Sequence, residues 1–417
     1  MTLEVPPRSL EHPLPAGMRD LLPEEAGVRR ALARRVLERF ALHGYALVTP
    51  PVFEFAEVLE RGLGTLDSAN VLRFVEPESG EVAALRPDMT PQVARIIATR
   101  LRGRPPPFRL GYEGTVLRRR RGRARTQRQI PQAGVELAGV AGPEGDLELI
   151  ELAVDAIRAT GLQQFTLDIG DAGIVRALLE DLPPERRALL SEAISRKDDA
   201  EIAQVCEAEG AAQADVLRAL PWLHGGRDAL VEGVARLAKT PAAAAAARLQ
   251  TLFEAAESRG LREHLTADLG EVRGLAYYTG TVFHAYAAGT GDAIVSGGRY
   301  DELLGRFGWD LPAAGFALDL DRVGEALLAA QIVADRPERA VVVGLANDAR
   351  IAELRADGVA AVAYADRAGA LAWARAWGFT HVLDASGWVD AATGTSIQRP
   401  LGDSLNGLAG KERRGLK

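Results

Sequence analysis

The spacing of apolar residues changes twice along this 417-residue chain, and these changes restrict the possible folds more than any other feature. Up to about residue 171 strand patterns alternate with helical ones, whereas residues 172–265 consist mainly of helix formers. Strand patterns resume over residues 266–283, and past Asp335 strands and helices alternate regularly. We therefore predict an α+β domain over residues 1–334 with a helical insertion at about 172–265, then a small α/β domain over 335–417 with a polar tail.

Local signals predict individual elements. Apolar residues at helical spacing predict a helix from Pro23 to Gly44, and a strand from Tyr45 to Thr49 follows it. Two apolar stretches within residues 108–136 predict an antiparallel hairpin around an arginine-rich loop. The pair Gly297-Gly298 suggests a turn, and a helix is predicted to start at Asp301.

Composition excludes several classes of protein. The formal net charge of −7 provides no overall attraction to nucleic acid, so such binding would need a local basic patch. A single cysteine, Cys206, excludes an internal disulfide framework and fits a reducing cytoplasm. The six histidines lack ligand spacing, and no apolar run suits a membrane span. We expect a cytoplasmic protein without a metal site or a membrane segment.

The segment 272–283, with the sequence VRGLAYYTGTVF, carries the most specific chemistry. Arg273 offers a guanidinium for a carboxylate, and Tyr277 and Tyr278 offer phenolic hydroxyls for a polar side chain. Two glycines beside these groups allow close approach of a ligand. This combination suits the binding of a small zwitterion.

A loop from Arg118 to Arg128 contains seven arginines. Three roles are open for it: a solvated loop, a clamp for the phosphates of ATP or a related anion, or a contact with nucleic acid. No aromatic residue interrupts the run, so base stacking is not indicated.

Four polar positions outside this loop have both a functional and a structural interpretation. Gln132 and Glu136 are four residues apart on a predicted strand, so they share one face, which is either a ligand pocket or a solvated surface. Asp88 and Thr90 precede a predicted helix, where they either hold an ammonium group or cap the helix. Arg322, at the start of another helix, either binds a triphosphate or pairs with a nearby acid.

The order of these segments resembles the catalytic domain of histidyl-tRNA synthetases over residues 14–330, including all three class II motifs. The motifs are carried by residues 17–20, 45–54, 86–90, 118–136, 273–283, 297–301 and 315–322. The resemblance implies a class II aminoacyl-tRNA synthetase-like antiparallel sheet of six or seven strands flanked by helices, and a homodimer through motif 1. It also implies that histidine is bound by Asp88, Thr90, Gln132, Glu136, Arg273, Tyr277 and Tyr278. Arg118 and Arg322 match the two class-defining arginines that hold ATP, and we assign them a vestigial phosphate site.

Several positions depart from the synthetase pattern. A glutamate is expected at Arg120, an acid at Ala276 and an arginine at Gly280, and Asp88-Met89 replaces a glutamate-glycine pair. A charge reversal beside a phosphate site changes the local electrostatics far more than a packing change does. The sequence therefore predicts that the histidine pocket is kept while the adenylate chemistry is lost.

This pattern is similar to that of the ATP phosphoribosyltransferase regulatory subunits, a family of synthetase paralogues. The similarity implies a non-catalytic subunit without a cofactor that assembles with a short-form catalytic phosphoribosyltransferase into a hetero-oligomer, expected to be a hetero-octamer. It implies a role in the first step of histidine biosynthesis, with histidine as the feedback effector and no tRNA partner. The alternatives are a histidyl-tRNA synthetase, or a synthetase paralogue that binds tRNA or another amino acid.

Overall fold

The computed structural model describes residues 14–63, 71–118, 127–209, 213–272, 278–332 and 338–398. Contacts between residues divide the chain into two compact units, Met1–Ile332 and Val333–Lys417. The predicted boundary at 334/335 lies within 333–337, outside the described residues. We propose the two units as the domains of this chain, and each is considered separately.

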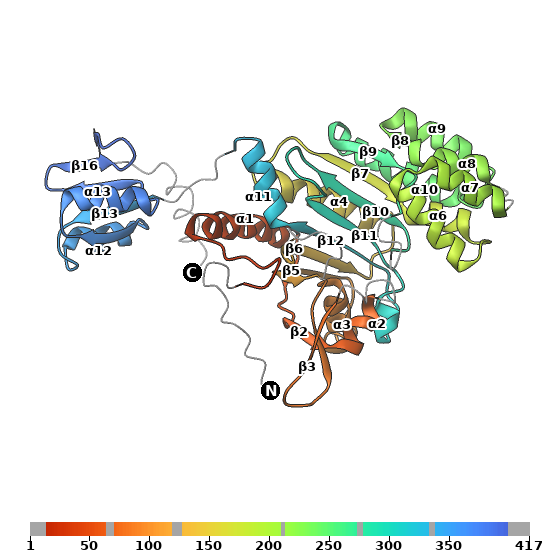
Figure 1. Cartoon of the computed structure of the whole chain (residues 1–417), viewed down its shortest axis with the longest axis horizontal. Helices are drawn as coiled ribbons and strands as arrows, with labels where there is room; N and C mark the ends of the chain where they lie inside the picture. Colours follow the sequence, from red (N-terminus) through yellow and green to blue (C-terminus); the bar gives the residue numbers. More distant parts are fainter. Residues whose placement is uncertain are drawn as a thin grey trace, which may run out of the picture. The chain divides into compact units, whose positions relative to one another are not determined.

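A large, mainly antiparallel sheet forms the centre of the first unit (Figure 1). In the described residues its strand order is β1-β5-β6-β12-β11-β10-β7-β9-β8. The strands are β1 (Ala46–Leu47), β5 (Phe108–Leu117), β6 (Gln129–Ala138), β7 (Thr166–Asp171), β8 (His224–Gly225), β9 (Leu265–Asp268), β10 (Thr281–Tyr286), β11 (Val295–Arg299) and β12 (Ala313–Asp319).

This sheet is wider than the six or seven strands expected, because it has nine strands in the described part of the chain. Two of them, β1 and β8, have only two residues each. The pairs β1–β5 and β7–β9 are parallel, and the other pairs are antiparallel. The predicted hairpin over residues 108–136 is confirmed, since β5 and β6 pair antiparallel from Phe108 opposite Ala138 to Leu117 opposite Gln129.

The strand β6 separates two apolar clusters because its side chains alternate between the faces of the sheet. Val135 and Leu137 belong to a cluster that includes residues of α1 (Pro23–Leu42), α4 (Glu144–Ala159) and α11 (Leu320–Ala329). Met89, Tyr112 and Tyr278 belong to the cluster on the other face, next to α3 (Thr90–Arg100). The even-numbered polar residues of β6 therefore point toward the α3 side.

A small sheet of order β2-β4-β3 adjoins α3. It is formed by β2 (Phe53–Phe55), β3 (Leu72–Val75) and β4 (Val82–Leu85), and the helix α2 (Ala56–Leu63) follows β2 in the chain. Figure 1 shows β2 and β3 next to α3. Leu59 of α2 and Ala84 of β4 are buried together on one face of this sheet.

The stretch 172–265 is largely helical in its described part. Its α-helices are α5 (Ala172–Leu179), α6 (Pro184–Arg196), α7 (Asp199–Glu209), α8 (Ala214–Ala219), α9 (Arg227–Leu237) and α10 (Ala243–Ser258). They gather at one end of the large sheet (Figure 1). The alanine-rich start of α10 packs closely, with Ala245 and Ala246 buried beside Leu249 and Phe253.

Two predicted elements near residue 300 are wrong. Gly297-Gly298 does not form a turn but lies inside β11, paired with β10 and β12. A Cβ atom at Gly297 would lie 2.4 Å from Cβ of Phe316, so the glycine serves sheet packing. The helix predicted from Asp301 is only a short 3-10 turn, Leu304–Phe307.

The second unit confirms the predicted alternation of strands and helices. Its sheet has the order β14-β13-β15-β16-β17, of which the first three strands are parallel. The elements are β13 (Arg339–Val343), α12 (Ala349–Ala356), β14 (Ala360–Tyr364), α13 (Arg367–Ala376), β15 (His381–Asp384), β16 (Gly387–Asp390) and β17 (Ser396–Ile397). The predicted polar tail, which follows Arg399, lies outside the described residues.

None of the helices in the described part of the chain is both long and apolar enough to cross a membrane.

Candidate functional site

Glu136 is the centre of a buried polar site on the α3 side of β6. Only 3% of its surface is exposed, and its Oε1 accepts a hydrogen bond of 2.6 Å from the hydroxyl of Thr90. Its Oε2 atom has no hydrogen-bond partner among the described residues. A buried oxygen that lacks a partner costs free energy, so a ligand that donates to it would be stabilised there.

Space for this carboxylate depends on a glycine in the neighbouring strand. Gly315 of β12 lies opposite Glu136 in the register, and a Cβ atom there would lie 2.0 Å from Oε2 of Glu136. The carbonyl oxygen of Val135 would lie 2.4 Å from the same added atom. In the sequence Gly315 is only part of a motif. The structure shows that a side chain at this position would collide with the Glu136 carboxylate.

Gln132 shares the face of Glu136, as the spacing on the strand predicted. It is 9% exposed, and its Oε1 atom also has no hydrogen-bond partner among the described residues. The alternative of a solvated strand face is therefore wrong for both residues. Two buried polar side chains that each keep an open acceptor suit a ligand with several hydrogen-bond donors.

Asp88 and Thr90 reach the site from the start of α3. Oδ1 of Asp88 accepts from the backbone nitrogen of Thr90 at 3.0 Å, so Asp88 stabilises the helix start as the structural interpretation predicted. Its other oxygen accepts from Nη2 of Arg118 at 3.3 Å. The hydroxyl of Thr90 is committed to Glu136 rather than to a cap, so the two residues have different roles.

Two buried tyrosines, Tyr112 and Tyr278, belong to the apolar cluster on this side of the sheet. Tyr112 of β5 is 1% exposed, and it faces Gly134 of β6, where a Cβ atom would lie 2.5 Å from the phenolic oxygen. Tyr278 is 7% exposed, and its ring would meet a Cβ atom at Gly298 at 2.9 Å. The sequence did not single out Tyr112. The pairing of Tyr112 with Gly134, on the strand that also contains Glu136, is the signal that could have identified Tyr112 as a residue of this site.

The charge of Glu136 is unfavourable in the ligand-free protein. Burial raises the pKa of the Glu136 carboxyl well above its usual range, and the negative charge of Asp88 raises it further. The hydrogen bond from the hydroxyl of Thr90 lowers it, but this does not outweigh the burial. Burial also raises the pKa of Tyr112. A cationic or donor-rich ligand would relieve this cost.

The two arginines assigned to a phosphate site are both engaged with protein groups. Arg118 donates through Nε to the carbonyl of Pro87 at 2.8 Å, in addition to its contact with Asp88. Arg322 lies 3.3 Å from carboxylate oxygens of both Asp292 and Asp319. Of the two alternatives for Arg322, the structure therefore shows the pairing with nearby acids.

Some predicted residues cannot be placed. Arg273 and Tyr277 lie outside the described residues, as do residues 119–126 of the arginine-rich loop. Five of the seven residues assigned to histidine are described, and the contacts above link Asp88, Thr90 and Glu136 directly. In the described ranges no group of three or more potential ligand side chains could hold a metal ion.

The chain is similar to proteins of two related kinds. A family model described as histidyl-tRNA synthetase matches residues 17–323. The ATP phosphoribosyltransferase regulatory subunit of Moorella thermoacetica is 40% identical over 362 residues, which are 84% of this chain and 91% of the relative. The ATP phosphoribosyltransferase regulatory subunit of Anaeromyxobacter dehalogenans is 43% identical over 323 residues, 76% of this chain and 92% of the relative.

Solved structures have the same architecture. An ATP phosphoribosyltransferase regulatory subunit/histidyl-tRNA synthetase from Bacillus halodurans C superposes with a TM-score of 0.76 at 29% identity, covering 91% of this chain and 98% of that chain. A histidyl-tRNA synthetase from Nostoc sp. PCC 7120 superposes with a TM-score of 0.76 at 22% identity, covering 92% of this chain and 96% of that chain. The second similarity concerns the fold alone.

Proposed function

Because this chain belongs to the family of ATP phosphoribosyltransferase regulatory subunits, which is built on the histidyl-tRNA synthetase fold, we propose that it binds histidine at the Glu136 pocket as a feedback effector. Its role is that of a regulatory subunit in the first step of histidine biosynthesis. The main support for histidine as the ligand is that Glu136 and Gln132 are buried and each has one acceptor oxygen without a hydrogen-bond partner among the described residues.

Histidine suits these acceptors chemically. Its ammonium group and its imidazole N–H groups are donors, and its carboxylate requires a cation such as Arg273. A ligand that binds one state of a complex better than another shifts the complex toward that state. Feedback inhibition therefore requires that the histidine-bound pocket favours the less active state of the assembly.

We further propose that the chain has no catalysis of its own. In support, Arg120 reverses a charge of the synthetase pattern, and Ala276 and Gly280 lack the charges expected there. Arg322, which would hold a triphosphate, is paired with two carboxylates. No cofactor is proposed, and tRNA is not proposed as a partner. The cytoplasmic location stays a prediction.

The direct test combines the purified chain with a short-form catalytic ATP phosphoribosyltransferase. We expect the chain to raise the rate of phosphoribosyl transfer and histidine to reverse that increase. The chain alone should give no histidine-dependent pyrophosphate exchange and should charge no tRNA. Detectable exchange by the chain alone would favour the alternative, a histidine–tRNA ligase. The partner is the catalytic subunit, and a hetero-octamer is the assembly we propose.

The homodimer proposed through motif 1 has a candidate surface on the small sheet. Phe53, Phe55 and Phe74 are exposed by 46%, 40% and 36%. Phe55 and Phe74 both pair with Ala83, so they share a face, and the rings of Phe53 and Phe74 meet edge to face at 5.2 Å. The matching segment 45–54 ends within β2. Exposed aromatic clusters of this kind mark protein–protein contacts.

Replacing Phe74 by aspartate should weaken the dimer roughly tenfold or more, because a charge would be buried against the second copy. Sedimentation velocity over a dilution series measures the shift. Val231→Asp, at an apolar position of α9 that is 50% exposed, is the matched control and should leave the dimer intact. An unchanged dimer in Phe74→Asp would exclude this face as the interface.

A further inference from the structure

Residues 278–280, which lead into β10, are held in part by the helical insertion. The carbonyl of Tyr278 accepts a hydrogen bond from Nη2 of Arg176, and the carbonyl of Gly280 accepts one from the backbone nitrogen of Ala172 at 2.9 Å. Both donors belong to α5, the first helix of the insertion, and they are four residues apart, so they share one face of that helix. One face of α5 therefore holds two alternate carbonyls of this segment.

Thr279, which lies between these two carbonyls, is held by the sheet instead. Its backbone nitrogen donates to the carbonyl of Arg299 at 2.7 Å, and its hydroxyl accepts from the backbone nitrogen of Asp301 at 2.9 Å. Arg299 is the last residue of β11 and is only 5% exposed. The carbonyl of Tyr278 is thus a point at which the insertion, rather than the sheet, acts on this segment.

The helix α5 is itself anchored within the insertion. Asp171, which is 2% exposed, caps α5 by accepting from the backbone nitrogen of Gly173 at 2.8 Å. Arg248 of α10 lies 3.1 Å from the carboxylate of Asp171. A Cβ atom at Gly173 would lie 3.0 Å from Nη2 of Arg248, so the two helices are in close contact here. A movement of α10 would therefore reach Arg176 through α5.

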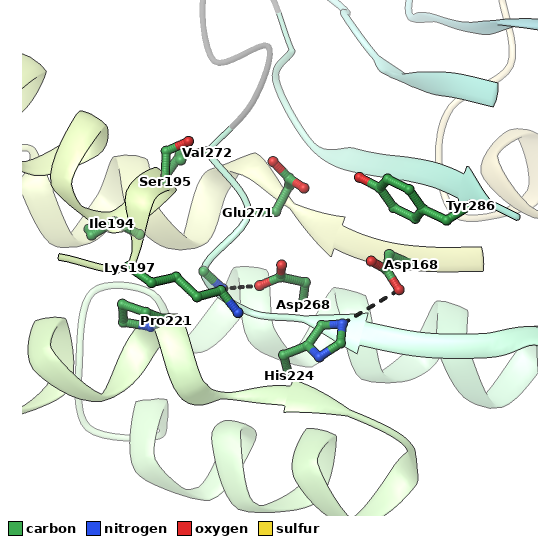
Figure 2. A pocket seen from close by; sticks show the side chains of 11 residues that line it. Asp168, Ile194, Ser195, Lys197, Pro221, His224, Asp268, Glu271, Val272 and Tyr286 are labelled. Carbon is green, nitrogen blue, oxygen red and sulfur yellow. Dashed lines mark hydrogen bonds and ion pairs between the residues drawn. The ribbon is translucent and has the colours of Figure 1, made fainter. Parts of the chain in front are cut away.

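The chain just before Arg273 is less closely packed. A cavity of about 380 Å³ lies between the insertion and the sheet, and Val272 is one of the residues that line it (Figure 2). In the same cavity Nε2 of His224, in β8 of the insertion, lies 3.5 Å from Oδ1 of Asp168 in β7. Contacts around an open volume constrain a segment less than packed contacts do. The anchor at Arg176 is thus the closer of these two links to the insertion.

The side chain of Tyr278 is the group that this anchor positions. It is 7% exposed, belongs to the apolar cluster on the α3 side, and would lie 2.9 Å from a Cβ atom at Gly298. The carbonyl carbon and the side chain are attached to the same Cα atom, so a shift of the carbonyl also moves the ring. Because Tyr278 is one of the residues assigned to histidine, such a shift would reach the ligand.

Arg176 has little structural work apart from this hydrogen bond. Its side chain is exposed, and among the described residues it forms no ion pair with a carboxylate. Substitutions of exposed residues of this kind have small effects on stability. A variant at Arg176 therefore separates the position of Tyr278 from the stability of the fold.

We propose that Arg176 is a positioning residue of the histidine pocket. Through the carbonyl of Tyr278 it holds the tyrosine ring in place for the ligand, and it connects the helical insertion to the pocket. This inference rests on the proposed binding of histidine. It gives the insertion a part in regulation, because a movement of α5 changes the affinity for the effector.

The test is isothermal titration calorimetry of the full chain with histidine. Arg176→Met removes the donors and keeps the apolar stem, and we expect it to weaken histidine binding roughly three- to tenfold, the effect of one hydrogen bond. Arg176→Lys should recover most of the affinity, because its ammonium group can donate to the same carbonyl. In the ligand-free chain, the amides of residues 278–281 should exchange hydrogen faster in Arg176→Met than in the parent.

Arg102→Met is the matched control, since Arg102 is also exposed and donates from Nη2 to a backbone carbonyl, that of Gly308, at 3.0 Å. It should bind histidine like the parent, and a thermal melt of each variant checks folding. A parent chain that binds no histidine would contradict the proposed function. A parent that binds while Arg176→Met is unchanged would contradict this inference alone. Unchanged hydrogen exchange, or an equal loss of affinity in Arg176→Lys and Arg176→Met, would also overturn it.

Discussion

Glu136→Gln should weaken inhibition by histidine by about ten- to a hundredfold while leaving assembly with the catalytic subunit intact. Glutamine keeps the shape of the side chain and can still accept from Thr90, but it cannot supply a negative charge to the ligand. A hydrogen bond to a charged group contributes about 1.5–3 kcal/mol, which corresponds to that loss of affinity. The measurement is the histidine concentration that halves the activity of the assembled complex.

The same variant separates a ligand-binding role from a structural one. Because the folded-state pKa of Glu136 is raised above its unfolded value of 4.5, the folded chain binds more protons than the unfolded chain between those two values. The contribution of Glu136 to stability is therefore complete below the unfolded pKa and is lost as the pH rises through the folded pKa. Glu136→Gln removes this dependence, so the ligand-free variant should be at least as stable as the parent at neutral pH.

Glu113→Gln is the matched control, because Glu113 is a carboxylate on the adjacent strand β5 with a side chain that is 33% exposed. It should leave the inhibition by histidine unchanged. Normal inhibition by histidine in a correctly assembled Glu136→Gln complex would contradict the proposed role of the pocket.

Asp146→Ala should destabilise the first unit by about 3–5 kcal/mol, because it leaves a buried guanidinium without its main partner. Asp146, at the start of α4, lies 2.7 Å from Nη2 of Arg299 in β11, and both side chains are 6% exposed. The hydroxyl of Thr281 in β10 also donates to Asp146, at 2.8 Å. One carboxylate thus joins a helix to two central strands.

Equilibrium urea unfolding measures this loss, and hydrogen exchange of the β10 and β11 amides shows whether it occurs in the sheet. Asp155→Ala is the control, since its partner His43 is on the surface and such pairs contribute about 0–1 kcal/mol. A loss below about 1 kcal/mol in Asp146→Ala would show that Asp301, which also pairs with Arg299 at 2.9 Å, is sufficient for the guanidinium.

The predicted fold class, a class II synthetase-like sheet with helices, is confirmed by the similarity to solved structures. The spacing of apolar residues along the chain was sufficient to predict long, regular elements, such as the helix α1 and the β5–β6 hairpin. The same spacing gave a wrong turn at Gly297-Gly298, because glycine occurs both in turns and in strands that other side chains approach closely. Here Phe316 lies against Gly297 and Tyr278 against Gly298, both inside a central strand. Distinguishing the two cases requires knowing which side chains lie across the strand.

The assignment of Gln132 and Glu136 to histidine binding also depends on which side chains lie across the strand. Strand spacing placed Gln132 and Glu136 on one face, but it left open whether that face is solvated or buried. The structure shows that the start of α3 covers this face of β6. Thr90 donates a hydrogen bond to Glu136, which is 46 residues further along the sequence. For Arg322, the sequence left a phosphate and an acid as alternatives, and only the structure shows Asp292 beside it.

The sequence by itself determined the family, the alternation of buried faces along the strands, and the helical character of residues 172–265. Only the tertiary structure decided which charges are buried, as for Glu136 and for the pair of Asp146 and Arg299. The physical reason is that periodicity arises from neighbours along the chain. Desolvation and ion pairing instead depend on contacts between segments far apart in sequence, such as Asp146 and Arg299 at a separation of 153.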